Sequence, residues 1–113
     1  MEFLELLQTG RPVLLDGGMG TMLQAKGLPV GATPELTALD HPEWLLDIHR
    51  AYVEAGAQIL YANTFGANRE KLSHCGKTVE EIVPAAVALA KEAAQGRALV
   101  ALDIGPTGQL LEP

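Results

Sequence analysis

The sequence predicts an α/β fold built on a parallel β-sheet. Three short apolar segments, at residues 12–15, 58–62 and 98–102, alternate with stretches of helical periodicity. None of the three alternates polar and apolar residues, which is typical of strands that are buried on both faces of a parallel sheet. Because alternating β and α units pack as a parallel sheet with right-handed crossovers, this order favours that architecture.

The first apolar segment ends abruptly in a carboxylate and a glycine cluster, Asp16-Gly17-Gly18-Met19-Gly20, and a helix is expected from Thr21. The glycines allow a sharp turn and a close approach to a ligand. Free N–H groups at a helix start can hold a carboxylate or phosphate, and Asp16 can bind an ammonium group. The loop can therefore hold both ends of an amino acid. An ordinary strand-to-helix turn capped by Asp16 fits the same residues.

The next segment, residues 27–37, is rich in Gly and Pro and is predicted to be a loop. A helix is expected to follow it, with Asp40 as the N-cap and Glu43 three residues later, and with Gly56 as its stop. Apolar residues recur at helical spacing between these two signals.

The second strand is expected to be followed by a short helix at residues 67–72 and then by a long one. Thr78 and Glu81 form a capping-box pattern at the start of the long helix, and Gly96 marks its end. Pro84 interrupts the apolar stripe, so we expect either a kink or a short first turn before the main helix.

Composition indicates one small acidic domain. The chain has 113 residues, is 48% hydrophobic and carries a formal net charge of −6. Its eight Lys and Arg are scattered, which argues against a nucleic-acid partner. No apolar run reaches the roughly 20 residues of a membrane span, and the acidic N-terminus lacks the basic start of a signal peptide. With the single Cys75, which excludes an internal disulfide, these features predict a cytoplasmic protein without a membrane partner.

Each predicted strand is followed by small or polar residues, in segments 16–21, 63–68 and 103–108. Carboxyl ends of parallel strands meet at one edge of a sheet, where barrels and open sheets bind their ligands. The chain stops soon after the third strand, whereas a (β/α)8 barrel needs about 250 residues. We therefore expect residues 1–113 to be the first three β/α units of a truncated (β/α)8 TIM barrel. An open strand edge would require the rest of the barrel or self-association.

The three strand-end motifs, together with Lys71-Leu72, resemble the homocysteine S-methyltransferase family over about residues 3–113. Within the family the chain is most similar to the homocysteine-binding module of the cobalamin-dependent methionine synthases. The resemblance implies a (β/α)8 barrel that binds homocysteine at its carboxyl-terminal face. It also implies a zinc ion, held by three cysteine thiolates, that binds the substrate sulfur.

Methyl donors in this family are methylcobalamin, betaine or S-methylmethionine, and the resemblance favours methylcobalamin with methyltetrahydrofolate. The zinc cysteines of the family lie on later strands, so this fragment alone is expected to be inactive. Cys75 does not match them and is predicted to lie in a surface turn beside His74. His41 and His49 are predicted to be solvated or to cap helices, and Trp44 to be a packing residue.

Eight positions match the substrate-binding residues of the family: Asp16, Gly17, Gly18, Met19, Asn63, Thr64, Phe65 and Asp103. The resemblance places Asp16 near the substrate's amino group and the turn at residues 17–19 near its carboxylate. Asp103 is expected either at the pocket floor or in a structural role, bonding loop N–H groups. The chain departs from the family at Ala62, where many relatives have a threonine, and at Leu102, where they often have a glycine.

Two other functions stay open from the sequence. The glycine turn is compatible with a phosphate- or nucleotide-binding module, although its spacing is not G-x-G-x-x-G and no acidic residue ends the second strand. A non-catalytic remnant or assembly subunit is compatible with an incomplete barrel.

Overall fold

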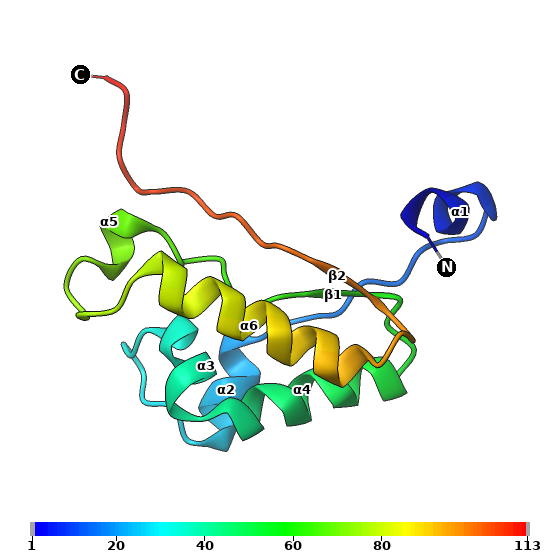
Figure 1. Ribbon diagram of the computed structural model, residues 1–113, viewed down its shortest axis with the longest axis horizontal. Helices are drawn as coiled ribbons and strands as arrows, with labels where there is room; N and C mark the ends of the chain where they lie inside the picture. The colour runs from blue at the N-terminus through cyan, green and yellow to red at the C-terminus, as the bar shows by residue number, and fades with distance from the viewer. Residues whose placement is uncertain (1, 113) are drawn as a thin grey trace.

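A computed structural model describes residues 2–112 of the chain (Figure 1). Its elements, in order, are α1 (Phe3–Gln8), α2 (Gly20–Lys26), the 3₁₀ helix η1 (Pro34–Leu36), α3 (Thr37–Asp40), α4 (Pro42–Glu54), β1 (Ile59–Tyr61), α5 (Arg69–Leu72), α6 (Val79–Ala94) and β2 (Leu99–Ala101). None of these helices is long and apolar enough to cross a membrane. The alternation of helices and strands confirms the predicted α/β class.

The sheet is parallel and follows the chain order. β1 pairs with β2 in the register Ile59 with Leu99, and Leu15 forms a single parallel bridge to Ile59 on the other side of β1. The predicted first strand is therefore reduced to one bridge. Pro12 has no N–H to donate to a ladder, and the N–H of Leu14 donates to the side-chain Oε1 of Gln58 at 2.9 Å instead of to a strand carbonyl.

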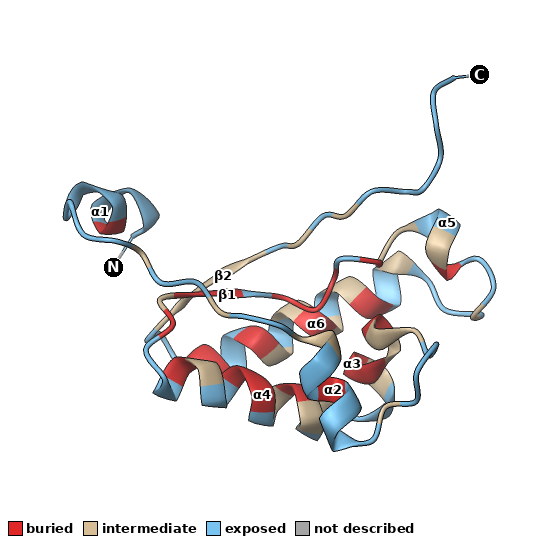
Figure 2. Cartoon of the chain, turned by 180° about the vertical axis from the view of Figure 1, so that it is seen from behind, coloured by how far each residue is buried: buried red, intermediate tan, exposed pale blue. Residues whose placement is uncertain are grey.

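The helices α2, α3, α4 and α6 cover one face of this sheet, as Figures 1 and 2 show from opposite sides. Large apolar side chains along the strand segments remain exposed, among them Leu14, Leu15, Tyr61 and Leu102. The expectation of a sheet buried on both faces is thus not met within residues 2–112. The uncovered apolar side chains explain why the strand sequences show no polar alternation.

The core lies between the helices and the covered face of the sheet. Leu23, Leu45 and Ile48 are fully or almost fully buried in one cluster, and Leu60 of β1 is fully buried in the other. Burying each such side chain contributes about 1.5–3 kcal/mol. The small Ala86 of α6 belongs to the first cluster and allows α6 to approach α4 closely.

The long helix α6 begins as its sequence predicts. The Thr78 hydroxyl accepts a hydrogen bond from the backbone N–H of Glu81 at 3.2 Å. Pro84 lies inside the helix, which runs unbroken from Val79 to Ala94, so the predicted short first turn is absent. The chain then leaves the helix through two residues in the left-handed region, Gln95 and Gly96.

The N-cap predicted for α4 is wrong. Asp40 is the last residue of α3, and His41 occupies the N-cap position before Pro42, which begins α4. Proline disfavours helical backbone in the residue before it and fits the first position of a helix, so the break falls between Asp40 and Pro42. Gly56, with a φ of +107°, follows the helix end where its stop was predicted.

The histidines of α4 and its cap have different surroundings. His41 is exposed and stacks on Trp44, with ring centroids 3.9 Å apart. His49 is completely buried, which contradicts the prediction that it is solvated or caps a helix. The prediction failed because His49 follows Ile48 on the inner face of an amphipathic helix, one turn after Leu45.

Candidate functional site

A cavity of about 270 Å³ lies at the carboxyl ends of the strands. It is called the carboxyl-edge cavity below. Its lining residues come from the first turn, from η1 and from the segments after β1 and β2: Asp16, Gly17, Met19, Gly20, Pro34, Glu35, Tyr61, Ala62, Asn63, Thr64, Phe65 and Asp103. Seven of the eight positions singled out from the sequence line it, and Gly18 does not.

Asp16 is fixed by the neighbouring strand. Its Oδ2 accepts a hydrogen bond from the backbone N–H of Tyr61 at 3.1 Å. Burial raises the pKa of Asp16 above its ordinary value, and the negative charge of Asp103 adds to the increase, while the backbone hydrogen bonds from Tyr61 and from Asp16 itself oppose it. A cation placed in the cavity would therefore stabilise the ionised form of Asp16.

The glycine turn is held from behind by α4. The Tyr52 hydroxyl donates to the Gly18 carbonyl at 2.6 Å, which engages Gly18 with the helix. A Cβ at Gly17 would lie 3.1 Å from the Tyr52 hydroxyl oxygen, so a side chain there would crowd the ring. In the part of the chain that the structure describes, the N–H groups of Gly17 and Met19 have no hydrogen-bond partner. The turn thus offers unused donors beside the cavity.

The segment after β1 is tied to two other loops by its buried polar side chains. Asn63 Nδ2 donates to the Pro34 carbonyl at 2.9 Å and so holds η1 against the strand end. Thr64 Oγ1 donates to the Asp103 carbonyl at 2.7 Å and lies 3.0 Å from the Asp103 backbone N–H. Phe65 is half exposed, with Lys71 Nζ 5.5 Å from its ring centroid. Asn63 and Thr64 therefore shape the cavity through backbone contacts.

Asp103 was open to two interpretations. Its backbone is clamped by Thr64, as described, whereas its carboxylate makes no hydrogen bond to a loop N–H within residues 2–112. The carboxylate lines the cavity and lies close enough to Asp16 to raise its pKa. This placement favours the pocket over the purely structural role.

Sequence reasoning missed Glu35, which lines the same cavity from η1 and is 7% exposed. The Gly and Pro content of residues 27–37 predicts a single loop there. A local signal was present: Thr33 precedes Pro34 and an acidic residue, which is typical of a helix start. That signal predicts η1, although it does not predict that Glu35 is buried.

The described part of the chain, residues 2–112, holds no group of three or more His, Cys, Asp or Glu side chains placed to bind a metal ion. The Cys75 thiol donates to the Leu72 carbonyl at 3.2 Å, at the end of α5. These residues do not fit a zinc site.

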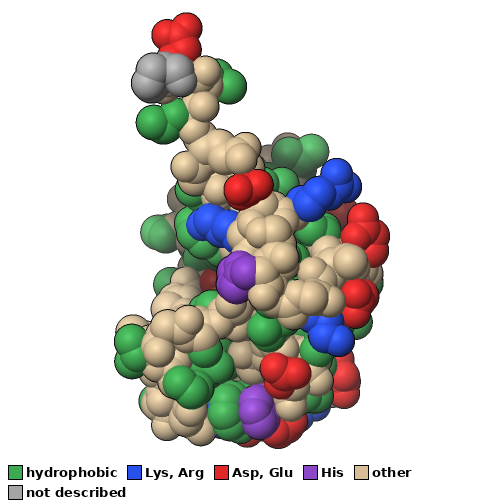
Figure 3. Space-filling model, turned by 90° about the vertical axis from the view of Figure 1, so that its left-hand side faces the viewer, with side chains coloured by type: hydrophobic (Ala, Val, Ile, Leu, Met, Phe, Trp, Pro, Cys, Tyr) green, Lys and Arg blue, Asp and Glu red, His purple; other side chains and the backbone are tan. Residues whose placement is uncertain are grey.

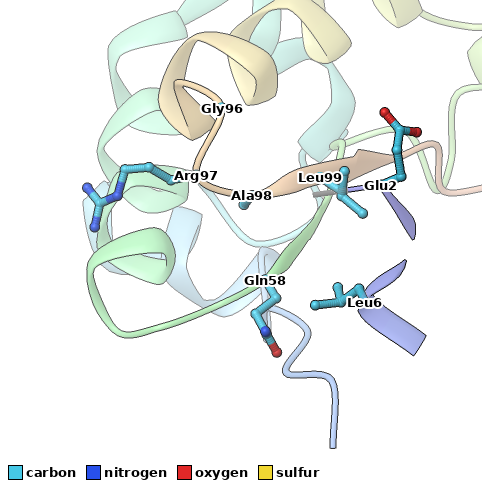
Figure 4. A pocket seen from close by; sticks show the side chains of 7 residues that line it. All are labelled: Glu2, Leu6, Gln58, Gly96, Arg97, Ala98 and Leu99. Atoms are coloured by element: carbon cyan, nitrogen blue, oxygen red, sulfur yellow. The ribbon is translucent and has the colours of Figure 1, made fainter. Parts of the chain in front are cut away.

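A second cavity, of about 410 Å³, lies at the opposite end of the strands. It is called the amino-edge cavity below. Figure 4 shows the residues that line it: Glu2, Leu6, Gln58, Gly96, Arg97, Ala98 and Leu99. Arg97 extends away from the others (Figure 4). Its Nη1 donates to Glu54 Oε1 at 2.9 Å.

The surface seen in Figure 3 carries acidic and basic side chains interspersed with apolar ones.

Comparison with known proteins gives a consistent result. The profile of the family "Homocysteine S-methyltransferase" matches residues 13–113. Betaine–homocysteine S-methyltransferase 1 from Danio rerio is 36% identical over 115 residues, which cover 96% of this chain and 28% of that protein. The protein of the same name from Xenopus tropicalis is 35% identical over 117 residues, with coverages of 96% and 29%.

Among solved structures, the metallated form of the homocysteine methyltransferase MmuM from Escherichia coli superposes with a TM-score of 0.79 at 26% identity. The superposition covers 93% of this chain and 42% of that one. The chain therefore spans less than half the length of each of these relatives.

Proposed function

The chain belongs to the homocysteine S-methyltransferase family, and we propose that its carboxyl-edge cavity binds the amino-acid part of homocysteine. The observation that carries the proposal is the charge of the cavity. Its lining residues include the carboxylates of Asp16, Glu35 and Asp103 and no basic side chain. A ligand with an ammonium group matches this lining.

Asp16 is the proposed contact for the ammonium group, because its Oδ2 accepts from Tyr61 and its other oxygen accepts no hydrogen bond from another residue. The unpaired N–H groups of Gly17 and Met19 are the proposed donors to the substrate carboxylate. Gly18, whose carbonyl is engaged by Tyr52, supports the turn. The proposed contacts thus hold the amino acid at both ends and leave its sulfur free.

For the protein to which this chain belongs, we propose methyl transfer to the sulfur of homocysteine. In that reaction the thiolate attacks the methyl carbon, a C–S bond forms, and the bond between the methyl group and its donor breaks. The relatives named above support betaine as the donor. They give no support to the methylcobalamin and methyltetrahydrofolate predicted from the resemblance to methionine synthases. Zinc stays a proposal for residues outside this chain.

The uncovered apolar face of the sheet supports a further structural proposal, that these units belong to a (β/α)8 barrel. Additional β/α units would cover side chains that are exposed here, among them Leu14, Leu15 and Leu102. The phosphate-binding alternative is disfavoured, because three carboxylates without a basic partner would repel a phosphate.

The binding proposal is tested by titrating L-homocysteine into the 113-residue chain under reducing conditions, using calorimetry. Asp16→Asn keeps the acceptor for the Tyr61 N–H but removes the charge. A charge-assisted hydrogen bond contributes about 1.5–3 kcal/mol, so Asp16→Asn should weaken binding about 10- to 100-fold. Asp40→Asn, at an exposed position whose carboxylate has no ion pair within the described residues, is the matched control. Equal affinities of Asp16→Asn and the original chain would refute the proposed contact.

Affinity should also depend on pH. The ammonium contact needs ionised Asp16, and burial raises the pKa of this carboxyl. Homocysteine binding should therefore weaken as the pH falls, starting above the usual range of an aspartate. Repeating the titration across that range in the original chain and in Asp16→Asn measures this. This pH dependence of affinity should be absent from Asp16→Asn. The same pH dependence in the original chain and in the variant would assign the effect to another group.

A further inference from the structure

We infer that Glu35 is a second residue that recognises the ammonium group of the substrate, a role that rests on the proposed binding of homocysteine. Glu35 lies in η1, is 7% exposed and lines the carboxyl-edge cavity. Its carboxylate makes no hydrogen bond and no ion pair with another residue of the described range 2–112. The carboxylate of this largely buried residue is therefore free to accept from a ligand that carries N–H donors and a positive charge.

The position of Glu35 is specified by its neighbours. The Pro34 carbonyl accepts a hydrogen bond from Asn63 at 2.9 Å, which fixes η1 beside the end of β1. Gly66 makes room for the carboxylate: a Cβ at Gly66 would lie 2.6 Å from Glu35 Oε1. The φ of Gly66 is not in the left-handed region, so space, and not backbone conformation, is the reason that this position suits glycine.

The chemistry of the proposed ligand calls for more than one acceptor. An ammonium group has three N–H donors, and Asp16 offers only one oxygen that accepts no hydrogen bond from another residue. Glu35 and Asp103 line the same cavity, but Asp103 belongs to the set already proposed from the sequence. Glu35 adds an acceptor from a different element, η1, so the ammonium group would be held between the first turn and η1.

The test compares L-homocysteine with 4-sulfanylbutanoic acid, which has the same thiol and carboxylate but no amino group. The original chain should prefer homocysteine. Glu35→Gln keeps the size of the side chain and removes its charge, and it should reduce this preference about tenfold while leaving the affinity for 4-sulfanylbutanoic acid unchanged. Glu70→Gln, an identical change at an exposed position in α5, should leave both affinities unchanged.

A second variant tests the position of the carboxylate. Gly66→Ala places a methyl group against Glu35 Oε1 and should displace the carboxylate, which lowers the preference for homocysteine in the original chain. In the Glu35→Gln background the same change should have little further effect on that preference, since the charge is already absent. Thermal melting monitored by circular dichroism checks that each variant is folded.

Each outcome separates the two proposals. If the original chain does not bind homocysteine, the proposed function fails, and the role of Glu35 fails with it. If the chain binds homocysteine and Glu35→Gln keeps the full preference, the role of Glu35 is refuted while the proposed function stands. If Glu35→Gln weakens both ligands equally, Glu35 is structural and the inference is overturned.

Discussion

The two ends of the same strands carry cavities of opposite character. The amino-edge cavity is the larger, about 410 Å³ against about 270 Å³ for the carboxyl-edge cavity. At the amino edge the polar side chains bond to the protein itself: Gln58 accepts from Leu14, and Arg97 pairs with Glu54. At the carboxyl edge, Glu35 and Asp103 present carboxylates without a partner in the described residues.

Unpaired charge, and not volume, is the basis for placing the proposed binding site at the carboxyl edge. The unpaired carboxylates at the carboxyl edge contribute no hydrogen bond to stability, whereas Gln58 at the other edge stabilises the pairing of the first segment with β1. The two edges are therefore expected to respond differently to mutation. Changes at the amino edge should lower stability alone, and changes at the carboxyl edge should alter binding.

The largest predicted effect is a loss of folding stability in acid, and it should be the same at both strand edges. His49 is completely buried in α4, and neither ring nitrogen has a hydrogen-bond partner within residues 2–112. Burial lowers the pKa of His49 from its ordinary value of 6.5 to about 4. Above pH 6.5 both the folded and unfolded chains have a neutral His49. As the pH falls from 6.5 to 4, the unfolded chain takes up the proton first, so the folded chain loses about 3 kcal/mol of stability.

Urea unfolding at a series of pH values between 7 and 4 measures this loss. His49→Leu should unfold with a flatter pH dependence, because the titrating group is gone, and His74→Asn, at an exposed position, should behave like the original chain. Hydrogen exchange should show both strand edges losing protection together. Loss of protection at the carboxyl edge alone would show that a local group there, and not His49, controls the response to acid.

The contrast between the two strand edges was only partly predictable from the sequence. The positions of Asp16, Asn63 and Asp103 follow from a general rule, since residues after successive parallel strands meet at one edge. The same rule predicts nothing about Glu35, which reaches the cavity from a segment between helices. Its place depends on the contact of Pro34 with Asn63, two residues 29 positions apart. Long-range packing of this kind leaves no local periodic pattern.

The helices and strands, like the site, were predictable only where local signals determine them. The long helix α6 was predictable because its cap, Thr78, and its apolar stripe act locally. The first strand was overestimated, because its leucines Leu14 and Leu15 are exposed and the N–H of Leu14 bonds to a side chain. Helix α1 was not predicted. It is six residues long and depends on a capping box between Glu2 and Glu5.

A matched pair of amide side chains sharpens the comparison between the edges. Asn63→Ala and Gln58→Ala each remove one hydrogen bond between a side chain and the backbone, with Pro34 and with Leu14 respectively. Each should lower the free energy of unfolding by about 1 kcal/mol. Only Asn63→Ala should also weaken homocysteine binding, by several-fold, because η1 and Glu35 lose their anchor.

Urea unfolding and calorimetric titration of the two variants measure these effects side by side. The contrast fails if Gln58→Ala weakens binding as much as Asn63→Ala does. That result would mean that the position of the first segment along β1, and not the lining of the cavity, determines affinity.

The smallest predicted effect concerns the glycine turn. Tyr52→Phe removes the hydrogen bond to the Gly18 carbonyl and keeps the ring that packs against Gly17. We expect a loss of about 1 kcal/mol or less in stability, since this contact is exposed to solvent. Binding should weaken about two- to fivefold, because the turn must be ordered before its N–H groups can receive the substrate carboxylate.

Titration with L-homocysteine and with 4-sulfanylbutanoic acid separates the effect of Tyr52→Phe from the recognition of the ammonium group. Tyr52→Phe acts on the end of the cavity that receives a carboxylate, so L-homocysteine and 4-sulfanylbutanoic acid should weaken equally. Asp16→Asn, by contrast, should weaken homocysteine alone. If Tyr52→Phe weakens homocysteine selectively, the turn must act through Asp16, and the assignment of the substrate carboxylate to the turn would be wrong.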